Sequence, residues 1–121
     1  MSRRVLIVDS SKLMRRLISE TLAEDGWATV GEANDDKETI KLFAELHPDA
    51  VTLDVLMSNG QGMEALKAIL QIDPQAKVVV VSALTQTKLI SEAIRAGAED
   101  FIAKPFMPEQ LQETLRLCLA K

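Results

Sequence analysis

Cysteine is almost absent from this sequence, and its scarcity excludes several kinds of site. A single thiol, Cys118, cannot form an internal disulfide, and one cysteine is too few for a zinc site or a thioredoxin-type motif. Cys118 shares an apolar stripe with Leu111 and Leu115. We therefore expect this thiol to pack in the core.

Long apolar runs and basic stripes are also missing. No stretch approaches the roughly 20 apolar residues that span a bilayer, and the first residues lack the pattern of a secretory signal. The formal net charge of −4 comes from mixed signs, so no run of Lys and Arg can neutralise nucleic-acid phosphates. We expect a cytoplasmic protein that binds neither membranes nor nucleic acids.

Short apolar runs dominate what is present. With 121 residues, 47% of them hydrophobic, the chain can bury the core of one domain over residues 1–121. Four runs rich in β-branched residues predict parallel strands covered on both faces: 5–8, 50–53, 78–81 and 101–103. The run 28–33 contains Gly31 and polar residues, which favours an edge strand.

Amphipathic stretches separate these strands. Apolar residues recur at three- and four-residue steps in five predicted helices: Leu13, Met14, Leu17, Ile18; Ile40, Phe43; Met63, Leu66, Ile69, Leu70; Leu89, Ile90, Ala93, Ile94; Leu111, Leu115, Cys118. Strict alternation predicts an α/β fold, a doubly wound parallel sheet with helices on both faces. Five strands favour the flavodoxin-like order 2-1-3-4-5, with a ligand crevice at the carboxyl ends of strands one and three.

Polar residues end four of the predicted strands. Asp9 and Asp54 end strands one and three, so the topology brings two carboxylates to one crevice. Such a pair needs a bound cation or a neighbouring ammonium group. Ser82 ends strand four, and Lys104 ends strand five with an ammonium that suits a phosphoryl oxygen. The cluster predicts a site for phosphoryl chemistry centred on Asp54.

Each of these residues also has a purely structural interpretation. Asp9 or Ser10 could cap the following helix, Ser82 could begin a turn, and Lys104 could be solvated. Their coincidence at four strand ends favours the functional interpretation.

The motifs that carry these residues resemble those of response-regulator receiver domains. They are Val5-Leu6-Ile7-Val8-Asp9, Leu53-Asp54, Val81-Ser82-Ala83 and Lys104-Pro105-Phe106. The match covers the whole chain and is closest to the stand-alone, CheY-like chemotaxis type, including Met14-Arg15-Arg16. The same strand order is known for that family, so the predicted order is not independent of the resemblance.

The resemblance implies a role for each matching residue. Asp54 would accept a phosphoryl group from a histidine kinase, and Ser82 and Lys104 would contact the acyl phosphate. Asp9, Asp54 and the backbone carbonyl of Leu56 would hold Mg²⁺. The resemblance also implies a cis Lys104-Pro105 peptide. The only catalysis expected is self-phosphorylation and self-dephosphorylation.

Two positions depart from the family pattern. Ser10 stands in the metal site where receivers usually carry a second acid, and a hydroxyl is a poorer Mg²⁺ ligand than a carboxylate. We expect Mg²⁺ affinity to fall by at least about tenfold and phosphorylation to slow. Ser58 stands where a proline is common, which predicts a more mobile Ser58-Asn59-Gly60 loop.

Signal lifetime and output depend on further positions. Leu56 and Leu84 stand where residues of the family position or exclude the hydrolytic water. Neither side chain can hydrogen-bond a water molecule, which predicts slow self-dephosphorylation. The small Ala83 leaves the site open to a phosphoryl donor. The resemblance implies that Ser82 moves toward the phosphoryl group as part of a switch, and Phe101 is either the aromatic of that switch or a core residue. The resemblance implies a monomer whose fourth helix, fifth strand and fifth helix bind an output protein, with the flagellar motor switch as one candidate.

Two other functions compete with a phosphorylated receiver. Ser10 favours a pseudo-receiver, an adaptor that binds partners without phosphorylation. A conventional enzyme is disfavoured because no glycine-rich phosphate loop follows strand one, and Asp54-Val55-Leu56 lacks the second acid of the aspartate-nucleophile phosphatases. We also expect no output domain, because the sequence stops with the fifth helix.

Overall fold

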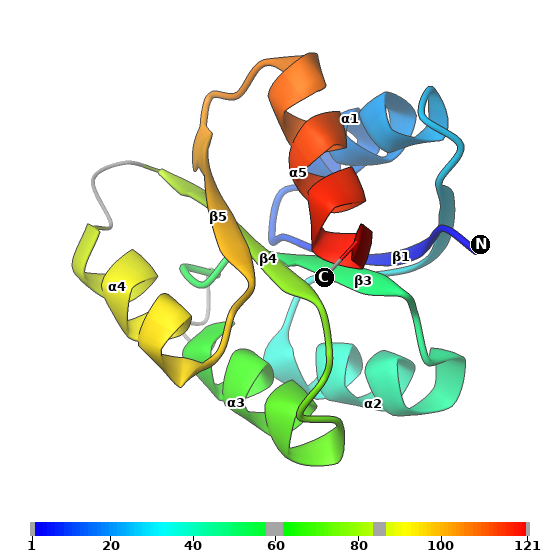
Figure 1. The fold of residues 1–121 in the computed structure, drawn as a ribbon. Helices are drawn as coiled ribbons and strands as arrows, with labels where there is room; N and C mark the ends of the chain where they lie inside the picture. The colour runs from blue at the N-terminus through cyan, green and yellow to red at the C-terminus, as the bar shows by residue number, and fades with distance from the viewer. Residues whose placement is uncertain (1, 58–61, 84–86, 121) are drawn as a thin grey trace.

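The computed structural model describes residues 2–57, 62–83 and 87–120. Within these ranges five strands alternate with five helices (Figure 1). The strands are β1 (Arg4–Val8), β2 (Ala28–Ala33), β3 (Ala50–Leu53), β4 (Val78–Ala83) and β5 (Asp100–Lys104). The helices are α1 (Lys12–Ala23), α2 (Asp36–Leu46), α3 (Gly62–Ile72), α4 (Thr87–Ala96) and α5 (Pro108–Ala120).

The sheet has the order that the sequence predicts. The strands follow one another as β2-β1-β3-β4-β5, and every neighbouring pair is parallel. The interrupted strand β2 lies at an edge, as expected. β4 continues to Ala83 and β5 ends at Lys104, so Ser82 and Lys104 lie at the carboxyl ends of their strands. The interpretation of Ser82 as the start of a turn is therefore wrong.

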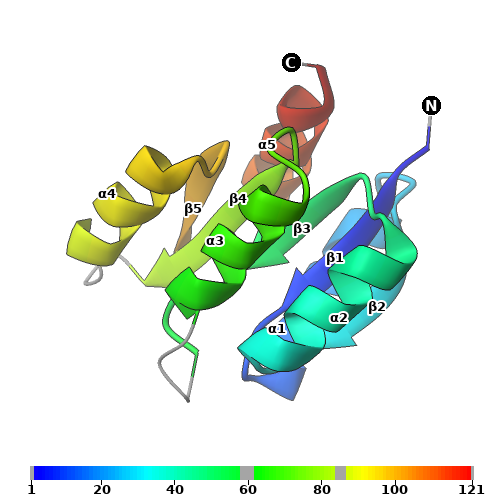
Figure 2. The ribbon, with the colours of Figure 1, turned by 90° about the horizontal axis from the view of Figure 1, so that it is seen from below.

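Helices cover both faces of this sheet. α1 and α5 lie on one face, and α2, α3 and α4 lie on the other (Figures 1 and 2). Each layer buries its own apolar cluster against the strands. Leu111, Leu115 and Cys118 are buried under α5, as the stripe predicts, and Trp27 is buried in the same cluster.

The apolar stripe predicted for the first helix is partly wrong. Leu13 is 78% exposed and Leu17 is also exposed, whereas Ile18 and Leu22 are buried. α1 packs on the sheet through the side that carries Ile18, Thr21 and Leu22. Because Leu13 and Leu17 lie about one turn apart on another side of the helix, they remain outside the core.

Local signals fix where α1 begins and ends. The side chain of Ser11 accepts a hydrogen bond from the Met14 amide at 3.1 Å, so Ser11 is the N-cap, and neither Asp9 nor Ser10 caps the helix. Gly26, at φ 81°, takes the left-handed conformation that follows α1. The Lys104-Pro105 peptide is cis, as the resemblance implies.

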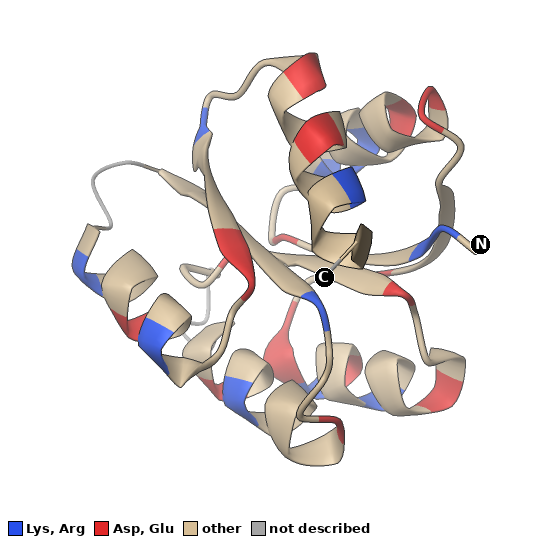
Figure 3. Ribbon diagram, in the orientation of Figure 1, with Lys and Arg blue, Asp and Glu red and all other residues tan. Residues whose placement is uncertain are grey.

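Charge is distributed over both helical layers. Figure 3 shows acidic and basic residues interspersed along the helices of both faces. Within the described ranges, every helix is too short or too polar to cross a membrane.

Candidate functional site

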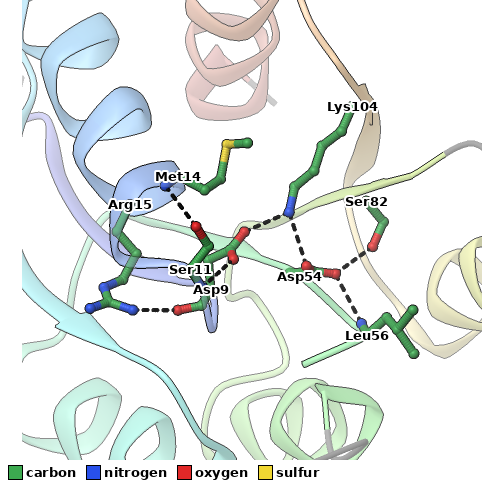
Figure 4. Close-up of polar contacts among 8 residues, drawn as sticks. All are labelled: Asp9, Ser11, Met14, Arg15, Asp54, Leu56, Ser82 and Lys104. Atoms are coloured by element: carbon green, nitrogen blue, oxygen red, sulfur yellow. Dashed lines mark hydrogen bonds and ion pairs between the residues drawn. The ribbon is translucent and has the colours of Figure 1, made fainter. Parts of the chain in front are cut away.

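Two carboxylates meet at the carboxyl ends of the central strands. Val8 pairs with Leu53, so the residues that follow them, Asp9 and Asp54, lie at the same edge of the sheet (Figure 4). The Asp54 amide donates to the Val8 carbonyl at 3.1 Å, and both acids are buried. The predicted convergence of Asp9 and Asp54 is confirmed.

Lys104 joins the two acids. Its Nζ lies 2.6 Å from Asp9 Oδ2 and 2.9 Å from Asp54 Oδ2, and the side chain is only 18% exposed. Burial alone lowers the pKa of this ammonium, but the hydrogen bonds and charges of Asp9 and Asp54 outweigh that effect and raise the pKa above its ordinary value. Lys104 therefore stays charged at neutral pH, and the solvated interpretation is wrong.

The other oxygen of Asp54 is held by two donors. The fully buried hydroxyl of Ser82 donates to Asp54 Oδ1 at 2.7 Å, and the Leu56 amide donates to the same atom at 3.0 Å. The register between β4 and β5, Ala83 to Lys104, brings Ser82 and Lys104 to this end of the sheet. Asp54 thus has an ammonium at one oxygen and two neutral donors at the other, an arrangement that can stabilise negative charge on an attached group.

Comparison with known proteins shows the family to which the chain belongs. The family model of the response regulator receiver domain matches residues 5–116. The chain belongs to this family.

Several CheY proteins resemble the chain over nearly its whole length. The chemotaxis protein CheY of Thermotoga maritima is 44% identical over 115 residues, covering 95% of this chain and 96% of that protein. CheY of Bacillus subtilis is 40% identical, with 98% and 99% covered. Among solved structures, the response regulator domain of Thermotoga maritima CheB matches with a TM-score of 0.90 and 34% identity, covering 100% of this chain and 98% of that one. The chain is a CheY-like receiver, and receivers are regulatory domains.

The oxygen atoms at this site suit a hard divalent cation, although few of them are charged. Asp9 and Asp54 offer carboxylate oxygens, the ligand type that Mg²⁺ prefers. In the described residues no group of three His, Cys, Asp or Glu side chains is placed to hold a metal ion. Ser10 is exposed beside Asp9 and supplies a hydroxyl where a third charge is usual.

Other predicted positions of the receiver are placed less centrally. The side chain of Leu56 is exposed close to Asp54. Phe101 on β5 is 38% exposed, so its interpretation as a core residue is wrong. Phe101 lines an open groove with residues of α4: Ile90, Ser91, Ile94 and Arg95. Leu84 and the Ser58-Asn59-Gly60 loop lie outside the described residues.

Arg15 contacts the site, although sequence reasoning assigned it no function. Its Nη1 donates to the Asp9 carbonyl at 2.7 Å, and its Nε donates to Glu32 Oε1 at 2.9 Å. The only available signal was the Met14-Arg15-Arg16 motif, which does not say which arginine points toward Asp9.

Proposed function

We propose that this receiver accepts a phosphoryl group from a histidine kinase on Asp54, with Mg²⁺, and signals by binding a partner protein. The observation that carries the proposal is the placement of Asp54 between Lys104 at one oxygen and Ser82 at the other. A new bond would form between an Asp54 oxygen and phosphorus as the bond from phosphorus to the kinase histidine breaks.

The residues around Asp54 would supply positioning and charge. The Lys104 ammonium can pair with a phosphoryl oxygen once transfer displaces its contact with Asp54. The Ser82 hydroxyl is a donor at the same carboxylate. Asp9, Asp54 and the Leu56 carbonyl would hold Mg²⁺, and water would occupy the place of a carboxylate at position 10. When bound, the ion would offset the negative charge of the transferred group.

Output would pass through α4, β5 and α5. Phe101 and Ile94 are exposed apolar side chains beside the groove on this face, and a partner could bury both. The CheY relatives are chemotaxis proteins, which makes the flagellar motor switch one candidate partner and a cytoplasmic site of action the natural setting.

The test is phosphorylation by a small donor. We expect incubation with acetyl phosphate and Mg²⁺ to add one phosphoryl group, seen by intact-protein mass spectrometry, and Asp54→Asn to abolish the addition. Asp73→Asn, which removes an exposed acid at the end of α3, is the matched control and should leave it unchanged.

The competing function is a phosphorylation-independent adaptor. Neither the fold nor the relatives support it, and Ser10 is the one feature that favours it. If Asp54 takes up no phosphoryl group, and beryllofluoride shifts no amide NMR signal even at high Mg²⁺, the adaptor replaces the phosphorylated receiver.

A further inference from the structure

Arg15 is buried differently from its neighbour Arg16. The Arg15 side chain is 14% exposed and runs from α1 toward the end of β1, whereas the Arg16 side chain is 77% exposed and lies 3.6 Å from Glu20 on the same helix. A guanidinium with little solvent access is retained only where it is well hydrogen-bonded. The two arginines therefore have different roles despite their adjacent positions.

The partners of Arg15 tie three elements together. Nη1 donates to the Asp9 carbonyl after β1, and Nε donates to Glu32 on β2 (Figure 4 shows the first contact). The Asp9 amide donates to the Ala33 carbonyl at 3.1 Å, also on β2. The main chain at Asp9 is thus held through both its amide and its carbonyl.

The carbonyl that Arg15 binds belongs to the peptide group between Asp9 and Ser10. Fixing this group fixes the direction in which Asp9 presents its carboxylate and the point from which Ser10 projects. The Asp9 side chain has its own contacts, with the Ser11 amide at 2.9 Å and with Lys104. Arg15 is the side chain that holds the backbone from which those contacts are made.

Glu32 offsets the positive charge of Arg15, which would otherwise repel a bound Mg²⁺. Asp9, Asp54 and Glu32 contribute three negative charges and Lys104 and Arg15 two positive ones, so this network has one formal negative charge. Without Glu32 the network would be neutral and less attractive to a divalent ion.

From these contacts we infer that Arg15 is a positioning residue for the metal-binding side of the site, with Glu32 as its counter-charge. The inference rests on the proposed use of Mg²⁺. It matters more in this chain than in a receiver with two adjacent acids, because Ser10 leaves Asp9 as the only carboxylate on this turn.

The test measures Mg²⁺ affinity directly, by titration followed through amide NMR shifts in the absence of any phosphoryl donor. We expect Arg15→Met to weaken Mg²⁺ binding by about tenfold, the size seen when an outer partner of a metal ligand is lost. The lost hold on the Asp9 backbone should outweigh the attraction gained when one positive charge is removed. Arg15→Lys keeps a donor and the charge but not the planar fork, so it should recover part of that loss.

Two further variants separate position from charge. Arg16→Met removes an exposed arginine from the same helix and should leave Mg²⁺ affinity unchanged. Glu32→Gln keeps an acceptor for Arg15 but removes its charge, so it should weaken Mg²⁺ binding less than Arg15→Met does. The loss of affinity in Glu32→Gln should shrink as salt is added, because salt screens the missing charge.

The outcomes distinguish this inference from the proposed function. If Arg15→Met and Arg16→Met bind Mg²⁺ equally well while only the unfolding free energy of Arg15→Met falls, Arg15 is merely structural and the inference is wrong. It is equally wrong if the unaltered protein binds no Mg²⁺. If Arg15→Met weakens Mg²⁺ binding but Asp54 never takes up a phosphoryl group, the inference stands and the proposed function fails.

Discussion

Ser10 is an uncharged residue at the position where the receiver motif usually carries a second acid. It lies between Asp9, which contacts Lys104, and Ser11, which caps α1. With a serine at this position, only the carboxylates of Asp9 and Asp54 remain to attract Mg²⁺, and both already contact Lys104. The site is consequently less negative than one with a third acid, and a bound Mg²⁺ would have fewer charged ligands.

Restoring an acid at this position should strengthen metal binding. We expect Ser10→Asp to raise Mg²⁺ affinity by at least about tenfold, because a carboxylate replaces a hydroxyl or a water molecule at the ion. The measurement is an Mg²⁺ titration by amide NMR, with the rate of acetyl phosphate uptake as a second readout.

Ser11→Asp is the matched control for this substitution. It adds the same charge one residue later, but the side chain at this position caps α1 by accepting from the Met14 amide, and aspartate serves equally well there. Its effect on Mg²⁺ affinity should therefore be much smaller. Equal affinities in Ser10→Asp and the unaltered protein would show that position 10 does not contribute a metal ligand.

At the scale of elements, Gly62 sets how closely α3 approaches the site. Gly62 is the first residue of α3, and a Cβ at this position would collide with the backbone of Val55, which follows Asp54. Because backbone cannot rotate away as a flexible side chain can, any substitution must displace the start of α3 or the segment after β3.

Gly62→Ala should therefore disturb both stability and the site. We expect it to lower the free energy of unfolding by about 3 kcal/mol, the upper part of the usual range for overpacking, and to slow acetyl phosphate uptake at Asp54. Gly26→Ala is the comparison: its Cβ would meet nothing within 4 Å, and the cost of its positive φ should be about 1 kcal/mol. Urea unfolding followed by the fluorescence of buried Trp27 measures both values.

A similar loss in the two variants, with normal phosphorylation of Gly62→Ala, would contradict the proposed close approach. It would mean that the segment after β3 relaxes around the added methyl group without moving Asp54.

Elements also show how far sequence reasoning reaches. The β-α alternation and the residues at strand ends were enough to place Asp9, Asp54, Ser82 and Lys104 at one edge, because topology alone decides which strand ends meet. The exposure of Leu13 was not predictable in the same way. A helical period shows that a stripe exists, but which side of α1 rests on the sheet depends on the packing of other elements.

Contacts within the site were beyond sequence reasoning for a different reason. Ser10 and Ser11 are equally good caps by composition, and Arg15 and Arg16 are equally long cations. Which one turns toward Asp9 depends on the exact start of α1 and on the rotation of each residue about its axis. A shift of one residue exchanges the roles within each pair, and helix boundaries are known from sequence only to within a few residues.

At the scale of the whole molecule, Asp54 and the face formed by α4, β5 and α5 are connected through β4. Ser82, which contacts Asp54, lies two residues after Val80, and Val80 pairs with Phe101 on β5. We therefore expect a change at the Ser82 hydroxyl to reach the groove beside Phe101 through this strand pair. Such coupling requires two arrangements of these elements whose balance Asp54 shifts.

Removing the Ser82 hydroxyl should separate the two ends of this connection. In the unaltered protein, we expect beryllofluoride and Mg²⁺ to shift amide NMR signals both around Asp54 and along α4 and β5. In Ser82→Ala, the shifts around Asp54 should remain while those of α4 and β5 shrink several-fold, because the contact that transmits the change is gone.

Fluorine NMR at saturating beryllofluoride verifies that both proteins are fully loaded, so weaker binding cannot imitate lost coupling. Ser91→Ala, which removes a hydroxyl lining the groove far along the chain from Asp54, should keep the full response. Undiminished shifts of α4 and β5 in Ser82→Ala would show that the signal leaves Asp54 by another path.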